Sequence, residues 1–167
     1  KDEVVVVSAA YDSGSHDVVS LLTMARELKN LDPSRTIRIL VFPFWLFMEH
    51  ARRGDFWEAR EEIVAVLSLE RMAEIGGSSD ARLKVGGPSL GKLEERLKSS
   101  NVDRVTHAAP QGIEQVFGEV GGAVFQMVEP ADLTRGLKEK SPGNDVEALI
   151  VRTRVLAEVV RELAERE

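Results

Sequence analysis

The sequence contains no cysteine, which excludes disulfide bonds, thiolate zinc sites and a cysteine nucleophile. Aromatic residues make up only 5% of the 167 residues. No apolar run approaches the roughly 20 residues that a membrane-spanning helix requires. A chain of this length can still bury a sizeable core as one domain without covalent staples.

Charge of one sign is not gathered into any long stretch. The 22 basic and 28 acidic residues give a formal net charge of −6, with both signs interspersed. This distribution argues against nucleic acid or an anionic lipid surface as the main partner. Abundant mixed charge without cysteine is also typical of proteins from thermophiles.

Four consecutive valines, Val4 to Val7, are the strongest structural signal. Because apolar and polar residues do not alternate there, the run predicts a strand buried on both faces, as at the centre of a parallel sheet. A polar loop follows and opens a helix with Asp17 as its predicted N-cap. Ligands of open α/β sheets bind beyond the carboxyl ends of strands, so Asp12, His16 and Asp17 are candidate functional residues.

Strands and helices alternate along the rest of the chain. The patterns predict further strands over residues 36–47, 63–69, 81–85, 102–107 and 123–128, a charged helical turn over 55–62, and helices over 17–28, 89–99, 111–120 and 144–165. Pro43 predicts a bulge, a sheet edge or the end of pairing. This alternation predicts an α/β fold, a three-layer sandwich with a mostly parallel central sheet flanked by helices.

The periodicity of the first and last helices predicts their buried faces. The first helix is expected to bury Val18, Leu21, Leu22, Ala25 and Leu28. The last is expected to bury Val146, Leu149, Ile150, Leu156, Val160 and Leu163.

Acidic residues also follow the second and third predicted strands. Glu49, next to His50, comes after the second strand, and Glu70 follows the third. Since the carboxyl ends of parallel strands share one edge, we expect Glu49 and Glu70 near Asp17.

Short motifs in this order resemble the M28-type zinc aminopeptidases and their relatives. The segments Ala9-Ala10-Tyr11-Asp12 and Gly14-Ser15-His16-Asp17 stand where that family carries Ala-His-x-Asp and Gly-x-x-Asp. The similarity continues through Leu67-Ser68-Leu69-Glu70-Arg71-Met72 to Lys140-Ser141-Pro142-Gly143-Asn144-Asp145, so it spans nearly the whole chain. It implies a zinc-exopeptidase-like fold in one domain, residues 1–167. Because the chain begins almost directly on a predicted central strand, we expect this domain to be excised from a longer protein.

The departures from the family pattern bear on catalysis. The resemblance puts Ala10 and Lys140 in place of the two metal histidines and Met48 in place of the general base. Methionine cannot take a proton from water, and a lysine at a ligand position repels a metal. Asp12 would orient a histidine that is missing. The positions that keep oxygen donors, and hence the residual metal candidates, are Asp17, Glu49 and Glu70.

The pair Glu49-His50 followed by Gly54, on a chain without the metal histidines, resembles the degenerate M28-like lumenal domain of the Gaa1-type subunit of GPI transamidase. This resemblance implies a non-catalytic binding or assembly module of a larger, membrane-associated protein. We then expect no cofactor, a protein or peptide partner, attachment to the membrane through segments outside this chain, and an extracytoplasmic location.

Two other hypotheses remain open. One is a metal-dependent aminopeptidase with a rearranged zinc site built from Asp12, His16, Asp17, Glu49, His50 and Glu70. The other is a carboxylate site for one calcium or magnesium ion, since hard cations accept oxygen ligands alone. The simplest alternatives are that Asp17 only caps a helix and that His16 is an ordinary surface residue.

Overall fold

The computed structural model describes residues 2–12, 15–43, 49, 61–69, 82–86, 105–107, 123–128 and 146–165. In chain order its elements are β1 (Asp2–Ala10), α1 (Ser15–Leu28), β2 (Thr36–Phe42), β3 (Glu61–Leu69), β4 (Arg82–Gly86), β5 (Val105–His107), β6 (Ala123–Val128) and α6 (Val146–Ala164). These elements confirm the predicted strands and the first and last helices, with shifted ends. The helices predicted over 89–99 and 111–120 lie outside the described residues.

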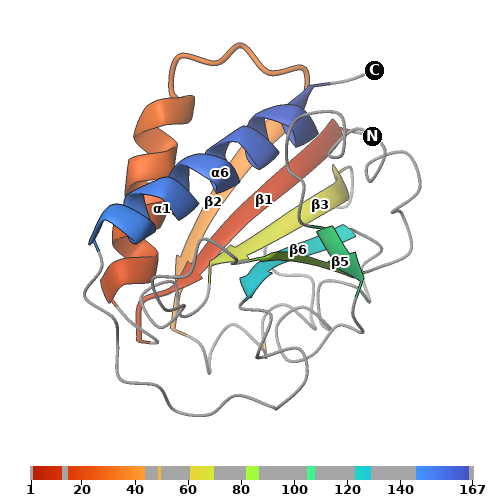
Figure 1. The fold of residues 1–167 in the computed structure, drawn as a ribbon. Helices are drawn as coiled ribbons and strands as arrows, with labels where there is room; N and C mark the ends of the chain where they lie inside the picture. Colours follow the sequence, from red (N-terminus) through yellow and green to blue (C-terminus); the bar gives the residue numbers. More distant parts are fainter. Residues whose placement is uncertain are drawn as a thin grey trace.

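In the described part of the chain, six strands form one sheet in the order β2-β1-β3-β6-β4-β5 (Figure 1). Parallel pairing joins β1 to β2, β1 to β3, β3 to β6 and β4 to β5. The pairing of β4 with β6 is antiparallel. The fold is therefore α/β, with parallel strands at the centre of a mixed sheet. The carboxyl ends of β1, β2, β3 and β6 meet at one edge, here termed the carboxyl edge.

The central strand β1 is buried on both faces, as its valines predict. From Val4 to Ala10 no residue is more than 1% exposed. Val5, Val7 and Ala9 belong to the core on one face, and the alternating residues are equally buried on the other. The strand needs no polar face because both of its faces are covered, while β2 and β3 pair with its backbone on either side.

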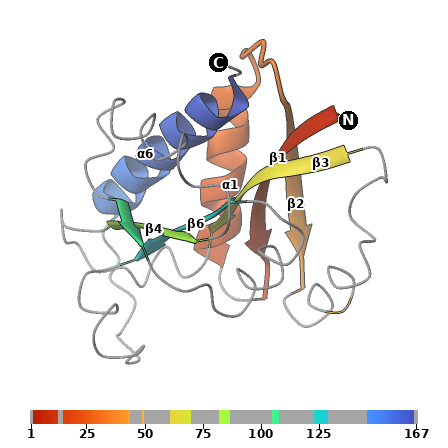
Figure 2. The ribbon, with the colours of Figure 1, turned by 90° about the vertical axis from the view of Figure 1, so that its right-hand side faces the viewer.

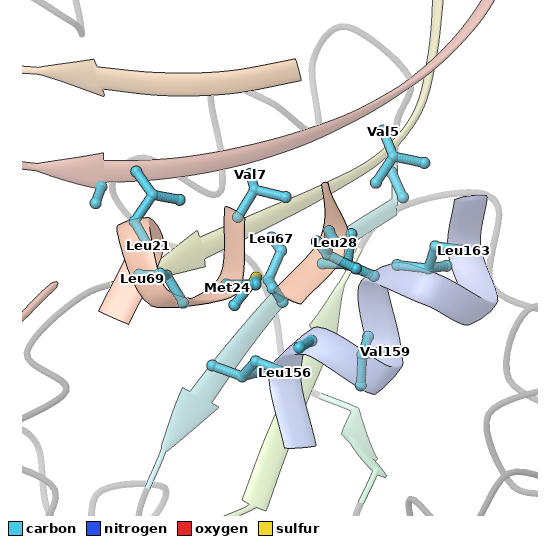
Figure 3. Packing of buried hydrophobic residues seen from close by; sticks show 14 residues of the cluster. Val5, Val7, Leu21, Met24, Leu28, Leu67, Leu69, Leu156, Val159 and Leu163 are labelled. Carbon is cyan, nitrogen blue, oxygen red and sulfur yellow. The ribbon is translucent and has the colours of Figure 1, made fainter. Parts of the chain in front are cut away.

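Helices α1 and α6 contact each other and cover the same face of the sheet (Figures 1 and 2). Figure 3 shows Leu21, Met24 and Leu156 packed between the helices and the sheet. Burying a large apolar side chain contributes about 1.5–3 kcal/mol, so this layer is a major source of stability. The buried cluster consists of Val5, Val7, Ala9, Leu21, Met24, Leu28, Ala65, Leu67, Leu69, Leu156, Ala157, Val159, Val160 and Leu163.

Of the described side chains predicted to be buried, two are exposed instead. Leu22 is 60% exposed and Ile150 is 45% exposed. Each helix contacts the sheet on one side only, so its buried stripe is narrower than the apolar pattern suggested. Met24 takes a buried place in α1 that the prediction left out.

Strand β2 ends earlier than predicted. It stops at Phe42 rather than at residue 47, because Pro43 has no backbone N–H for the ladder. The strand is also at the edge of the described sheet, so two of the outcomes predicted from Pro43 occur together.

The helical turn predicted over residues 55–62 is wrong at its end, because Glu61 and Glu62 belong to β3. Glu61 is in register with Asp2 of β1. The Arg38 guanidinium donates to both Glu61 carboxylate oxygens, with Nη1 2.6 Å from Oε2. Strand pairing with β1 and the bidentate ion pair with Arg38 therefore stabilise Glu61 in a strand, although its charged surroundings in the sequence favour a helix.

Arg35 fastens the carboxyl end of α6 to the sheet. Its Nη1 donates to the carbonyl oxygens of Leu163 (2.9 Å) and Glu165 (2.8 Å), and its backbone N–H donates to that of Ala164 (2.9 Å). Its Nε lies 2.6 Å from Oε2 of Glu3 in β1. The last carbonyls of a helix lack partners within the helix and carry partial negative charge, so a cation satisfies both needs.

We expect Arg35→Ala to lower the free energy of unfolding by about 2 kcal/mol, because it removes the guanidinium that donates to two helix-end carbonyls and to the Glu3 carboxylate. Chemical denaturation followed by circular dichroism measures the loss. The matched control is Arg161→Ala, which breaks an exposed ion pair with Glu158 and should cost less than about 0.5 kcal/mol. Equal losses in the two variants would contradict the role of Arg35.

Neighbouring leucines of α1 provide a second test. Leu21 is fully buried and Leu22 is exposed. Leu21→Ala should lower the free energy of unfolding by about 3 kcal/mol through lost contacts and a cavity. Leu22→Ala should change it by less than about 0.5 kcal/mol. A larger loss from Leu22→Ala would show that α1 is rotated relative to the arrangement described above.

Candidate functional site

The carboxyl edge brings together the ends of the three strands that precede the acidic candidates. Ala10 at the end of β1 is in register with Phe42 at the end of β2, and Ala9 is in register with Leu69 at the end of β3. The backbone N–H of Tyr11 donates to the carbonyl oxygen of Phe42 at 3.0 Å. The loop between β1 and α1 therefore starts against the end of β2.

Among the candidates that the structure describes, Asp17 is the one that is buried. It is 1% exposed and belongs to the first turn of α1. The prediction that Asp17 is the N-cap is wrong, because α1 begins at Ser15. A carboxylate in a first helical turn is still favoured by the positive end of the helix dipole. Asp17 also takes part in an interaction with another group, as a buried polar residue requires.

The exposed candidates are Asp12, His16 and Glu49. Asp12 lies in the turn after β1, and His16 precedes Asp17 in α1. Consecutive helix residues are rotated by about 100°, which explains why Asp17 is buried while His16 is at the surface. The structure therefore does not bring His16 and Asp17 to a common interior site. The surface alternative for His16 agrees with its exposure.

Four other positions that the family resemblance singled out lie outside the described residues: Met48, His50, Glu70 and Lys140. Within the described ranges, no three His, Asp or Glu side chains gather closely enough to hold a metal ion. No helix of the described ranges is long and apolar enough to cross a membrane.

Sequence reasoning missed two buried serines near the carboxyl edge. Ser8 in β1 is 0% exposed and Ser68 in β3 is 3% exposed, and the two are in register. The Ser8 hydroxyl makes no hydrogen bond. The signal in the sequence is a single polar residue inside each of the two apolar runs that predict β1 and β3.

Comparison with known proteins finds no matching family model, no matching curated protein and no matching solved structure. The class that the structure defines is an α/β domain. The M28-type resemblance is therefore supported by the short sequence motifs alone.

The burial of Asp17 predicts a structural contribution. Asp17→Ala should lower the free energy of unfolding by about 2 kcal/mol, because it removes a buried side chain from the first turn of a helix, where the helix dipole favours a carboxylate. His16→Ala, one residue away and exposed, should change it by less than about 0.5 kcal/mol. Denaturant titrations with and without EDTA measure both. A loss that appears only without EDTA would instead make Asp17 a metal ligand.

Proposed function

We propose that the chain is a non-catalytic M28-peptidase-like domain and acts as a binding or assembly module of a larger, membrane-associated protein. The observation that carries the proposal is Ala10, which ends β1 and is 1% exposed. The family resemblance puts a metal histidine at this position. A buried methyl group has no lone pair for a metal, so the strand end that should hold the first ligand offers none.

The fold proposed with this function is a three-layer sandwich of the zinc-exopeptidase type. One outer layer is the pair α1 and α6, and the sheet is the middle layer. Val4, Val6 and Ala10 are also buried, on the face of β1 that is turned away from these helices. Apolar side chains on that face need a cover of their own, which supports a third layer.

The rearranged zinc peptidase is less well supported. It needs His16 and Asp17 to converge on one metal, yet His16 is at the surface and Asp17 is inside. A calcium or magnesium site would have to join the buried Asp17 to the exposed Glu49 and to Glu70, which lies outside the described residues.

Exposed apolar side chains support a protein or peptide as the partner. Val19 and Leu22 are 55% and 60% exposed on α1, and Ile39 and Val41 are 40% and 46% exposed on β2. In the described sheet β2 is an edge strand, and an edge with β-branched side chains is the kind of surface that other chains pair with. An extracytoplasmic location and membrane attachment outside this chain belong to the same proposal.

The test combines metal content with activity. The chain, purified without a histidine tag and dialysed against zinc, should hold far less than one zinc per molecule in elemental analysis. It should not release amine from aminoacyl p-nitroanilides above the rate in buffer, because the general base is absent. About one zinc per molecule together with amine release that Asp17→Ala abolishes and His16→Ala retains would overturn the proposal.

A further inference from the structure

The outer side of β2 has no neighbouring strand in the described part of the sheet (Figure 1). The backbone N–H of Tyr11 donates to the carbonyl oxygen of Phe42, so this carbonyl points toward β1. Backbone groups of successive strand residues point to opposite sides, so the N–H and C=O groups of Ile37, Ile39 and Val41 point outward. An edge with outward backbone groups can pair with the strand of another chain.

The side chains of the same three residues make this edge apolar. They are in register with the residues of β1 that pack on α1 and α6, so they lie on the helix-covered face of the sheet. Ile39 and Val41 are 40% and 46% exposed, whereas Ile37 packs partly against the core. A strand that paired with this edge would therefore bury β-branched side chains in addition to satisfying backbone groups.

The one charged side chain of β2 is directed away from the edge. It belongs to Arg38, whose guanidinium donates to Glu61 of β3 and therefore reaches across β1. Charged side chains commonly protect edge strands from pairing with other chains. Because the charge of Arg38 is neutralised on the inner side of β2, the outer edge lacks this protection.

We propose that β2 pairs in antiparallel fashion with β2 of a second copy of this chain, about a two-fold axis at Ile39. Ile39 then lies opposite its own copy, and Ile37 lies opposite Val41 on both sides of the axis. All of these are hydrogen-bonded pairs, because their backbone groups point outward. Arg38 lies opposite Leu40, so no like charges oppose each other along the paired strands.

Self-complementarity favours a second copy over an unrelated peptide. A two-fold interface places one surface against the same surface, and here β-branched residues meet β-branched residues at each hydrogen-bonded pair. Moving the axis to position 38 would place Arg38 opposite its own copy. Moving it to position 40 would place Ile37 opposite Pro43, which has no N–H to donate. The pairing goes beyond the proposed function and does not rest on it, since it needs no peptidase motif.

The first experiment is analytical ultracentrifugation of the purified chain over a range of concentrations. The mass should rise toward that of a dimer as the concentration increases. Ile39→Lys should raise the dimer dissociation constant about tenfold or more, because it places two like charges opposite each other at the axis. The matched control is Ile150→Lys, which adds the same charge on α6 at a side chain of similar exposure, 45%, and should leave the dissociation constant unchanged.

Single-cysteine variants test the register, because the chain has no cysteine of its own. Ile39→Cys should form a disulfide-linked dimer under mild oxidation, since Cα atoms of a hydrogen-bonded pair are about 5.5 Å apart. Ile37→Cys alone should not, because it would lie about 14 Å from its copy along the paired strands. An equimolar mixture of Ile37→Cys and Val41→Cys should cross-link. Ile150→Cys measures the rate of random collision, and non-reducing electrophoresis reports every case.

A chain that remains monomeric up to millimolar concentration would overturn the proposal and leave the edge to a different partner. So would a dimer that Ile39→Lys weakens no more than Ile150→Lys does. Cross-linking of Ile37→Cys alone, or of Ile150→Cys as fast as Ile39→Cys, would contradict the pairing equally. Should Ile39→Lys fail to fold, the unmodified chain and the cysteine variants decide the question. The zinc and amine-release measurements test the proposed function separately.

Discussion

The rest of the structure depends on the burial of β1 on both faces. One face of the strand packs on α1 and α6 through Val5, Val7 and Ala9. On the other face, the ion pair of Arg38 in β2 with Glu61 in β3 joins the two strands that flank β1, and therefore crosses over it. A strand enclosed in this way cannot slip by one residue without exposing or clashing seven buried side chains, Val4 to Ala10. Its register then fixes which loops meet at the carboxyl edge.

The hydrogen bonds of Arg35 connect the first strand, β1, to the last helix, α6. Arg35 lies just before β2, yet its partners are Glu3 of β1 and the carbonyl oxygens at the end of α6. Figure 1 shows the amino end of β1 and the carboxyl end of α6 at the same end of the molecule. The position of the last helix thus depends on contacts with β1 and with the turn before β2 as well as on its packing against α1. The stability of this layer is consequently shared between segments far apart in sequence.

The sequence allowed the central strand, the first and last helices and the order of elements to be predicted, because uninterrupted apolar runs and a period of 3.6 are strong local signals. The exposure of Leu22 and Ile150 could not be predicted, since it depends on how far each helix is turned toward the sheet. The extension of β3 to Glu61 depends on Arg38, which comes from another strand. At the candidate site, the loop after β1 was located correctly, but the opposite exposures of His16 and Asp17 follow from the helix starting at Ser15.

Asp17 and Ser8 are both buried polar residues near the carboxyl edge, but they contribute differently to the stability of the folded chain. Asp17 takes part in an interaction and stands in the first turn of α1, so the stability of the folded chain accounts for its presence. An aspartate at this position of α1 is therefore weak support for a metal. Ser8 has no such account, because its hydroxyl is buried without a partner and an alanine would fill the same space. The two residues therefore differ in how their polar atoms are satisfied, and this difference by itself assigns a binding role to neither.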